Sequence, residues 1–433
     1  MAQRRQPLLA KLSAAIAGAS ARSLSAQAFA LVDQGCLSAS TFATTALLAH
    51  TAGFADLGTF SIVWMVILLV NAIQVAIVTA PMASLAPSDA AAVPRYHAYY
   101  LGLEGRFLGV LMAAAAVIVA ASLATGTPRM ALALPALAAV GAYQVFDFVR
   151  RFAHATARHR EAAVLSAIVA VVQFGVLVTL RASQSLTVDT AFIAIAVIMA
   201  ACSLLAAWRV LPRRTGPWSD HALGARSWQS SRWLLGSAVM HWTCGNIFFL
   251  LSPAYIGLGG TGALRAAQSI VGVVNVWYLG LENVMPLHAG QLWRGAGPRQ
   301  AARFVGRLSL LWTGVTGAFV ALVVYFADPL LLAVYGPQAE GYRWVLQWFA
   351  ALQLLIFLAL PLRSLLRAAE DTRGIFLGFV AATVFSLAAV LPLLHTLGLA
   401  GVLVGLTCAQ FVFQSVLAWH VWRRFQQLKA SPS

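Results

Sequence analysis

The sequence predicts an all-α polytopic membrane protein with about 12 transmembrane helices in two six-helix lobes. Of its 433 residues, 61% are hydrophobic and only 10% are charged, whereas soluble domains carry about 45–50% apolar and about 25% charged residues. A hydrocarbon core of about 30 Å takes about 20 helical residues per crossing, so the chain can hold roughly a dozen crossings with short loops. A soluble globular protein is therefore excluded.

Twelve apolar runs of helical length mark the expected spans. Lipid offers no hydrogen-bond partner to backbone groups, and the runs are too long and too uniformly apolar for barrel strands, so each must be a helix. The expected spans are residues 26–49, 57–80, 107–125, 129–149, 162–181, 188–209, 233–255, 263–285, 306–327, 343–362, 375–394 and 399–421.

The distribution of basic residues predicts the orientation of the chain in the membrane. Lys and Arg number 29 against 13 acidic residues, a formal net charge of +16, which in a soluble protein would indicate nucleic acid as a partner. Here they gather in the N-terminal segment, in alternate segments between spans and in the C-terminal tail, which is the positive-inside pattern of an even number of spans. We expect both termini in the cytoplasm and the lipid bilayer, not nucleic acid, as the partner.

A polar, basic stretch in the middle of the chain divides six spans from six. This division predicts a basic cytoplasmic N-terminal segment, an N-lobe with helices 1–6, a cytoplasmic linker, a C-lobe with helices 7–12 and a cytoplasmic tail. These parts cover residues 1–22, 23–211, 212–232, 233–422 and 423–433, respectively.

A repeated spacing indicates that the second and eighth spans are copies of each other. In each span a Gly is followed 13 residues later by an Asn and then by a Pro. An even number of spans separates the copies, so both run in the same direction, which predicts two lobes related by an axis along the membrane normal. The matched residues are Gly58, Asn71 and Pro81 in the second span and Gly262, Asn275 and Pro286 in the eighth.

No catalytic or cofactor site is predicted. The only lysines, Lys11 and Lys429, lie in no phosphate-binding loop, because such a loop needs a Gly-rich turn that ends in Lys next to Ser or Thr. The four cysteines have no paired spacing that would indicate a disulfide or metal site. The expected outside loops are too short for a catalytic domain. We therefore expect no enzyme, no metal and no cofactor.

Polar side chains inside the spans are the candidate site residues. An ionisable side chain at the bilayer centre costs about 2.5–3.5 kcal/mol, so each one retained indicates a cavity or a partner. In the eighth span they form a stripe about 100° wide on one helix face. Hydrogen bonds to neighbouring helices would explain the stripe; a water-filled substrate cavity is the favoured alternative, because an Arg and a Glu are included. The expected cavity residues are Arg265, Gln268, Asn275, Glu282, Asn71, Gln74, Gln34 and Asn246.

Asp33 is the candidate ion-coupling residue, for H⁺ or Na⁺. It lies about two turns inside the first span, where a carboxylate stays charged beside a cation or takes up a proton. The alternatives are that Asp33 is hydrogen-bonded to Ser, Thr or Arg within its lobe, or that water reaches it. The pair Arg150-Arg151, at the end of the fourth span, is expected to anchor the helix at lipid headgroups; attraction of a phosphate-bearing substrate is the alternative. His241 is expected to be a packed core histidine.

Several local strings follow one another in a fixed order along nearly the whole chain. They are Asp33-Gln34-Gly35 with Ser38 and Phe42, Gly53-Phe54, Leu57-Gly58-Thr59-Phe60, Ala80-Pro81, Arg232-Trp233-Leu234-Leu235, Gly262-Ala263-Leu264-Arg265-Ala266-Ala267-Gln268, Leu281-Glu282-Asn283-Val284-Met285-Pro286, Leu332-Ala333-Val334-Tyr335-Gly336 and Leu365-Leu366-Arg367-Ala368. In this order the strings resemble the multidrug/oligosaccharidyl-lipid/polysaccharide (MOP) exporter superfamily, and within it the bacterial polysaccharide (Wzx-like) flippases.

The resemblance implies a V-shaped pair of lobes, as in MATE transporters, in the bacterial cytoplasmic (inner) membrane. It implies a flippase that moves polyprenyl-pyrophosphate-linked oligosaccharide for exopolysaccharide or surface glycan assembly, with a polysaccharide polymerase or export proteins as partners. Arg265 is then the intramembrane cation for the pyrophosphate. The chain departs from the lipid II flippases, which have fourteen spans and several cavity arginines. A MATE-type cation-coupled multidrug exporter is the alternative, because that branch also places a carboxylate in its first span, as at Asp33.

Overall fold

The computed structural model describes residues 6–87, 89–124, 130–212 and 219–430, and every element in these ranges is a helix. The first half of the chain comprises α1 (Gln6–Ala52), α2 (Phe54–Gln74), η1 (Val75–Thr79), α3 (Ala80–Ser84), α4 (Val93–Ala124), α5 (Met130–Ala155), α6 (His159–Ala182) and α7 (Val188–Val210). The second half comprises α8 (His221–Leu251), α9 (Pro253–Val271), η2 (Gly272–Val274), α10 (Asn275–Gly295), α11 (Pro298–Tyr325), α12 (Ala327–Tyr335), η3 (Pro337–Ala339), α13 (Arg343–Phe357), α14 (Ala359–Ala368), α15 (Thr372–Leu397) and α16 (Leu399–Ala430).

The helices confirm a multi-pass all-α membrane protein. Eleven helical stretches of the described chain are long and apolar enough to cross a bilayer, and each overlaps one of the second to twelfth expected spans. The first expected span lies in α1, which is not among the eleven. Its described part carries Asp33, Gln34 and several Ser and Thr residues, which lower its mean hydropathy. Among these residues, Asp33 and Thr44 form hydrogen bonds with side chains in the interior of the first lobe.

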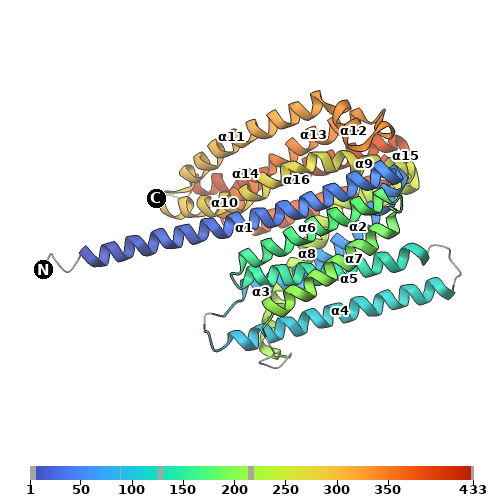
Figure 1. Cartoon of the computed structure of the whole chain (residues 1–433). Helices are drawn as coiled ribbons and strands as arrows, with labels where there is room; N and C mark the ends of the chain where they lie inside the picture. The colour runs from blue at the N-terminus through green and yellow to red at the C-terminus, as the bar shows by residue number, and fades with distance from the viewer. Residues whose placement is uncertain (1–5, 88, 125–129, 213–218, 431–433) are drawn as a thin grey trace.

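The helices form two groups, with α1 running the length of the molecule between them (Figure 1). In the first group α5 packs against α7, and α1 packs along α6. In the second group α15 packs against α16 and α8, and α10 packs against α14. The groups meet mainly where α2 lies against α9 and α8. This arrangement agrees with the expected division into two lobes.

The predicted repeat is visible where α2 crosses α9. A Cβ atom added at Gly58 would lie 2.1 Å from the carbonyl oxygen of Leu258, and one added at Gly262 would lie 1.8 Å from that of Phe54. Each glycine thus faces the carbonyl four residues before the other glycine, so the contact is reciprocal, as at a two-fold axis. Only glycine allows the two backbones to approach so closely. The crossing is a close contact between the two lobes.

Aromatic and amide groups close the same end of the molecule. The ring of Phe54 lies 6.0 Å from that of Tyr335 and 5.6 Å from that of Tyr342, both edge-on. Gln338 donates a hydrogen bond from Nε2 to the backbone carbonyl of Ala49. These contacts join α1 and α2 of the first lobe to the α12–α13 segment of the second. We call this set of contacts, with the Gly58–Gly262 crossing, the seal.

Some helix boundaries differ from the expected ones, because capping and backbone geometry determine where a helix begins or is interrupted. The predicted linker 212–232 ends early, because the side chain of Asp220 accepts hydrogen bonds from the backbone amides of Ala222 and Leu223 and starts α8 at His221. The expected eighth span is interrupted by the 3₁₀ turn η2, and α9 is kinked before this span at Gly257, whose φ is 70°. The segment 6–22 continues α1 as helix, and most of the expected tail continues α16 to Ala430.

A candidate substrate cavity and a buried charge network

A charge network fills the interior of the first lobe. Asp33 on α1 receives a hydrogen bond from Nη1 of Arg150 at 2.5 Å, another from the hydroxyl of Ser166 on α6, and lies 3.0 Å from Nε2 of His154. Only 2% of Asp33 is exposed. A carboxylate buried to this extent is stable only when it is paired and hydrogen-bonded, and here α5 and α6 supply every one of those partners.

Asp147 is the second acidic centre of this network. Its two oxygens accept hydrogen bonds from Arg150 and Arg151, each at 2.5 Å, and from Nδ2 of Asn71 at 2.8 Å. The spacings of three and four residues place all three α5 side chains on one helix face. Arg150 therefore bridges Asp33 and Asp147, and it is itself buried. The network balances two carboxylates against two guanidinium groups.

Amide side chains extend the network toward α2 and α4. Nε2 of Gln74 donates to Oε1 of Glu104 at 2.7 Å and to the backbone carbonyl of Gln144 at 3.0 Å. Gln74 is fully buried and Glu104 nearly so. The other carboxyl oxygen of Glu104, Oε2, has no hydrogen-bond partner among the described residues. The first lobe thus presents a continuous polar interior across α1, α2, α4, α5 and α6.

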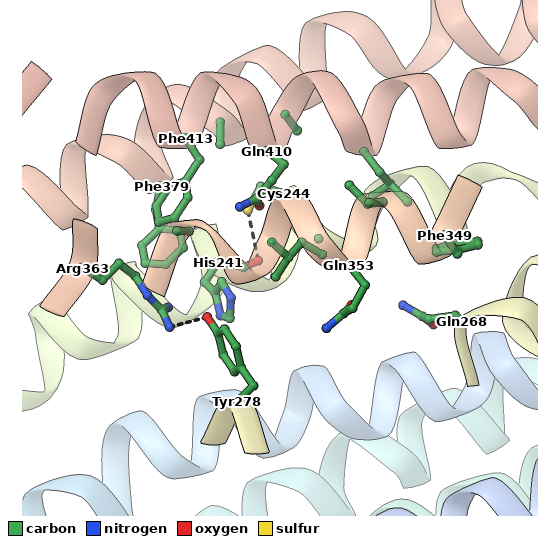
Figure 2. Close-up of a pocket in the computed structure, with 17 residues that line it drawn as sticks. His241, Cys244, Gln268, Tyr278, Phe349, Gln353, Arg363, Phe379, Gln410 and Phe413 are labelled. Carbon is green, nitrogen blue, oxygen red and sulfur yellow. Dashed lines mark hydrogen bonds between the residues drawn. The ribbon is translucent and has the colours of Figure 1, made fainter. Parts of the chain in front are cut away.

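The second lobe holds a cavity of about 210 Å³, lined by residues of α8, α9, α10, α13, α14, α15 and α16 (Figure 2). Three carboxamides line it, from Gln268, Gln353 and Gln410, together with Arg363 and Tyr278. None of its described lining residues is Asp or Glu. Its apolar part is aromatic and aliphatic, with three Phe rings. The cavity is consequently cationic, rich in amides and partly aromatic.

Arg363 sets the charge of the cavity. Its Nη2 donates to the hydroxyl of Tyr278 at 2.7 Å, the contact drawn in Figure 2, and to Oε1 of Glu282 at 2.6 Å. Arg367 reaches the same carboxylate oxygen at 3.2 Å. Two guanidinium groups therefore share one carboxylate, and Nε of Arg363 has no partner among the described residues. One positive charge remains uncompensated at this end of the cavity.

Arg265 is a second cation of this lobe. Its Nη1 donates to Oε1 of Gln268 at 2.9 Å, and Gln268 lines the cavity. No ion pair among the described residues includes Arg265, and its buried Nε lacks a partner. A guanidinium group without a carboxylate inside a membrane protein is a functional candidate.

The expected site residues fall into two separate sets. Gln268 lines the C-lobe cavity, and three others contact its lining: Arg265 through Gln268, Asn275 at 3.4 Å from Gln353, and Glu282 through Arg363. Asn71 and Gln74 belong instead to the N-lobe network. Asn246 donates to the carbonyl of Trp242 in its own helix, and Gln34 is half-buried on α1. The structure therefore does not unite the eight residues around one cavity.

Two expectations need correction. Arg150 is not a lipid-facing anchor, because it is 7% exposed and bonded to two buried carboxylates. His241 is not packed into the apolar core, because it lines the cavity with its ring 4.8 Å from that of Phe379. Asp33 takes the hydrogen-bonded arrangement with Ser and Arg that was one of its alternatives. The side chain of Asn283 lies outside what the structure describes.

Sequence reasoning placed Arg150 and Arg151 at the lipid headgroups and missed the other α5 members of the network, as well as the α13–α16 wall of the cavity. The run Gln144, Asp147, Arg150, Arg151 and His154 repeats at three- and four-residue spacing, which is the signal of one polar helix face. Arg363 and Gln410 sit alone in apolar surroundings, and their role depends on tertiary packing that no local pattern carries.

Solved structures share this fold. An inward-facing MATE multidrug resistance transporter of the MOP superfamily matches with a TM-score of 0.74 and 14% identity, over 91% of this chain and 96% of that one. A MOP superfamily transporter from Pyrococcus furiosus, described as having a binding pocket of reverse polarity, matches with a TM-score of 0.67 and 13% identity. This match covers 94% of this chain and 95% of that one. The chain has the fold of the MATE transporters. No protein-family model and no curated protein sequence matches it.

An outward-facing MATE structure, again at 14% identity, matches with a TM-score of 0.61 over 94% of this chain and 95% of that one.

Proposed function

We propose that the protein is a secondary transporter that moves polyprenyl-pyrophosphate-linked oligosaccharide across the bacterial cytoplasmic membrane by alternating access. The observation that supports this substrate most is the charge of the C-lobe cavity, whose described lining contains Arg363 but no Asp or Glu. A cation-binding drug exporter needs the opposite polarity. An anionic headgroup matches a guanidinium group, which binds phosphate through two parallel hydrogen bonds.

The other lining residues suit the saccharide. Carboxamides of Gln268, Gln353 and Gln410 offer donors and acceptors to hydroxyl groups. Rings such as Tyr278 and Phe379 offer flat apolar surfaces to sugar rings. A cavity of about 210 Å³ holds a small part of such a molecule. The polyprenyl tail would remain in lipid beside the lobes, so the cavity binds only the polar part.

The lobe arrangement supports transport by alternating access. With the seal closed at one end, substrate would enter from the opposite, Arg-rich end, which we assign to the cytoplasm on the basis of the positive-inside pattern. Substrate would bind there, and the lobes would then rock against each other as rigid bodies, breaking the seal. A ligand drives such a switch only by its difference in affinity between the two states.

Asp33 is proposed to couple the switch to H⁺ or Na⁺. It connects α1 to α5 and α6 through Arg150, His154 and Ser166, and α1 also contacts α9, α10 and α12 of the other lobe. Neutralising the carboxylate would weaken the α1–α5 ion pair and alter how α1 sits between the lobes. Arg150 would remain paired with Asp147.

Multidrug export is the second candidate. The solved MATE structures of this fold include multidrug transporters, and the cavity has three Phe rings suited to aromatic drugs. The cavity charge distinguishes the two functions. A cationic drug would meet Arg363, whose carboxylate partner Glu282 is shared with Arg367, whereas a pyrophosphate would be attracted to it.

Direct binding tests the proposal. Purified protein in nanodiscs is titrated with a polyprenyl-pyrophosphate-linked disaccharide and, separately, with a cationic dye. We expect binding of the lipid, weakened about ten- to hundredfold by Arg363→Gln, the effect of removing a charged hydrogen bond. Arg343→Gln, which alters an exposed arginine paired with Asp328, is the matched control.

A second variant controls for misfolding caused by an unpaired buried charge. Arg363→Gln leaves Glu282 with Arg367 alone, so Glu282→Gln combined with Arg363→Gln removes both charges and retains amide hydrogen bonding. Saturable binding of the dye that Arg363→Gln improves, with no binding of the pyrophosphate lipid, would overturn the proposal in favour of drug export.

A further inference from the structure

A pair of histidines connects the buried charge network to the surface. His154, in the last turn of α5, lies with Nε2 3.0 Å from Oδ2 of Asp33 and with Nδ1 3.1 Å from Nδ1 of His159, the first residue of α6. The two rings are tilted with centroids 5.4 Å apart. Three titratable groups thus form one hydrogen-bonded line.

The line runs from the interior outward. The side chain of Asp33 is 3% exposed and that of His154 is 23% exposed, and His159 is half-buried in the turn that links α5 to α6. That turn is tight: Ala157 has a φ of 58°, and the amide of Arg158 donates to the carbonyl of Ala153 at 2.8 Å. The backbone therefore holds the two imidazoles next to each other.

The nitrogen-to-nitrogen contact dictates how protons are placed. Nδ1 of one histidine must donate and Nδ1 of the other must accept, because two bare or two protonated nitrogens would repel. When His154 donates from Nε2 to Asp33, its neutral ring presents a bare Nδ1, which accepts from Nδ1–H of His159. Both rings are then neutral, with each hydrogen bond directed toward Asp33.

We propose that His159 and His154 form a proton relay that delivers H⁺ from the aqueous phase to Asp33. A proton from hydronium binds Nε2 of His159; the proton on its Nδ1 passes to Nδ1 of His154; and the proton on Nε2 of His154 passes to Oδ2 of Asp33. One N–H bond forms and one breaks at each ring. Hydronium loses one proton and becomes water, Asp33 gains one, and both imidazoles end neutral with the hydrogen bonds reversed.

The surrounding charges permit this uptake. Arg150, Arg151 and Asp147 face the site from α5, Cys36 lies near Asp33 on α1, and Ser166 is the α6 contact. At the turn, Arg158 and Glu161 approach to 3.7 Å, and Arg158 also donates to the carbonyl of Arg209 on α7. Arg160 is exposed beside them. The network is neutral before uptake, and a single added proton leaves the Arg150–Asp147 pair intact.

The role of the relay rests on the proposed ion coupling at Asp33, but its test needs no transported substrate. The full-length protein in lipid film is subjected to a downward pH jump while the infrared carboxyl band is followed in time. The Asp33 band is the one that Asp33→Asn removes. We expect His159→Ala to slow the appearance of this band at least tenfold without changing its final amplitude, and His154→Gln to slow it as well.

Chemical rescue separates a relay from a structural role. Free imidazole added to His159→Ala should restore most of the lost rate, because it can occupy the vacated space and carry the proton. His288→Gln, a change at an exposed histidine bonded to its own helix, is the matched control and should have no effect.

Unchanged rates in both histidine variants, or slowing that imidazole does not rescue, would overturn the relay and leave coupling at Asp33 standing. Absence of any Asp33 band across the accessible pH range would overturn both the relay and proton coupling. The choice of substrate is independent of either result.

Discussion

Substituting the glycine at the α2–α9 crossing perturbs the contact between the lobes directly. Gly58→Ala adds a single methyl group whose carbon would lie 2.1 Å from the carbonyl oxygen of Leu258. Restoring an ordinary separation of 3.4 Å requires a displacement of 1.3 Å, and the opposing atoms are backbone, not a flexible side chain. The helices must therefore move apart.

The expected magnitude follows from overpacking. Forcing one methyl group into a close-packed contact costs about 1–3 kcal/mol, which shifts a two-state equilibrium about 5- to 150-fold. The sealed state carries this cost, whereas a state with the seal open does not. Gly175→Ala is the control, because Gly175 lies in α6 with nothing within 4 Å of an added Cβ, and Ala is the better helix former by about 1 kcal/mol.

Spin-label distances measure the shift. Labels at the exposed positions Glu161 and Arg299, one in each lobe, are introduced after the four native cysteines are replaced by Ser. We expect Gly58→Ala to deplete the wild-type distance and populate a second one, and Gly175→Ala to leave the distribution unchanged. A wild-type distribution in Gly58→Ala, with full thermal stability, would refute the reasoning that this crossing limits lobe separation.

Three further perturbations follow from the structure. Asp147→Asn should destabilise the fold by about 3–5 kcal/mol, because it leaves Arg150 buried with one carboxylate fewer; the unfolding midpoint in detergent measures this, and an unchanged midpoint would contradict it. Asp33→Asn should abolish the response of transport to an imposed ion gradient, and a retained response would remove Asp33 from coupling. Phe54→Ala should open the seal, because it removes two ring contacts. A cysteine introduced at the buried Ser61 should then react faster with a membrane-impermeant thiol reagent, and an unchanged labelling rate would exclude opening of the seal.

Composition and hydropathy predicted the fold class because a bilayer permits few solutions. Apolar runs of about 20 residues had to be helices, and the residues Gly58 and Gly262 of the predicted repeat meet at the lobe crossing. The exact ends of the helices could not be predicted in this way. Asp220 starts α8 inside the predicted linker, and η2 interrupts the eighth span, which hydropathy does not register.

The site was harder to predict because its polar residues find partners across helices far apart in the sequence. Asp33 and Asn71 were identified as unusual, but their partners Arg150 and Asp147 lie more than 70 residues away on α5. A basic pair at a helix end has the pattern of a lipid anchor, and only packing shows that Arg150 turns inward. The cavity likewise depends on Arg363, which no local motif marks.

Flipping of a polyprenyl-pyrophosphate-linked saccharide in reconstituted vesicles tests the account most directly. The labelled lipid is placed in one leaflet, and its arrival in the other is read by an impermeant sugar-modifying reagent, with wild type, Arg363→Gln and Arg343→Gln compared. We predict protein-dependent flipping that Arg363→Gln reduces at least tenfold and Arg343→Gln leaves intact. The proposed flippase function would be contradicted if flipping were no faster than in protein-free vesicles and the same preparation moved a cationic dye along an ion gradient.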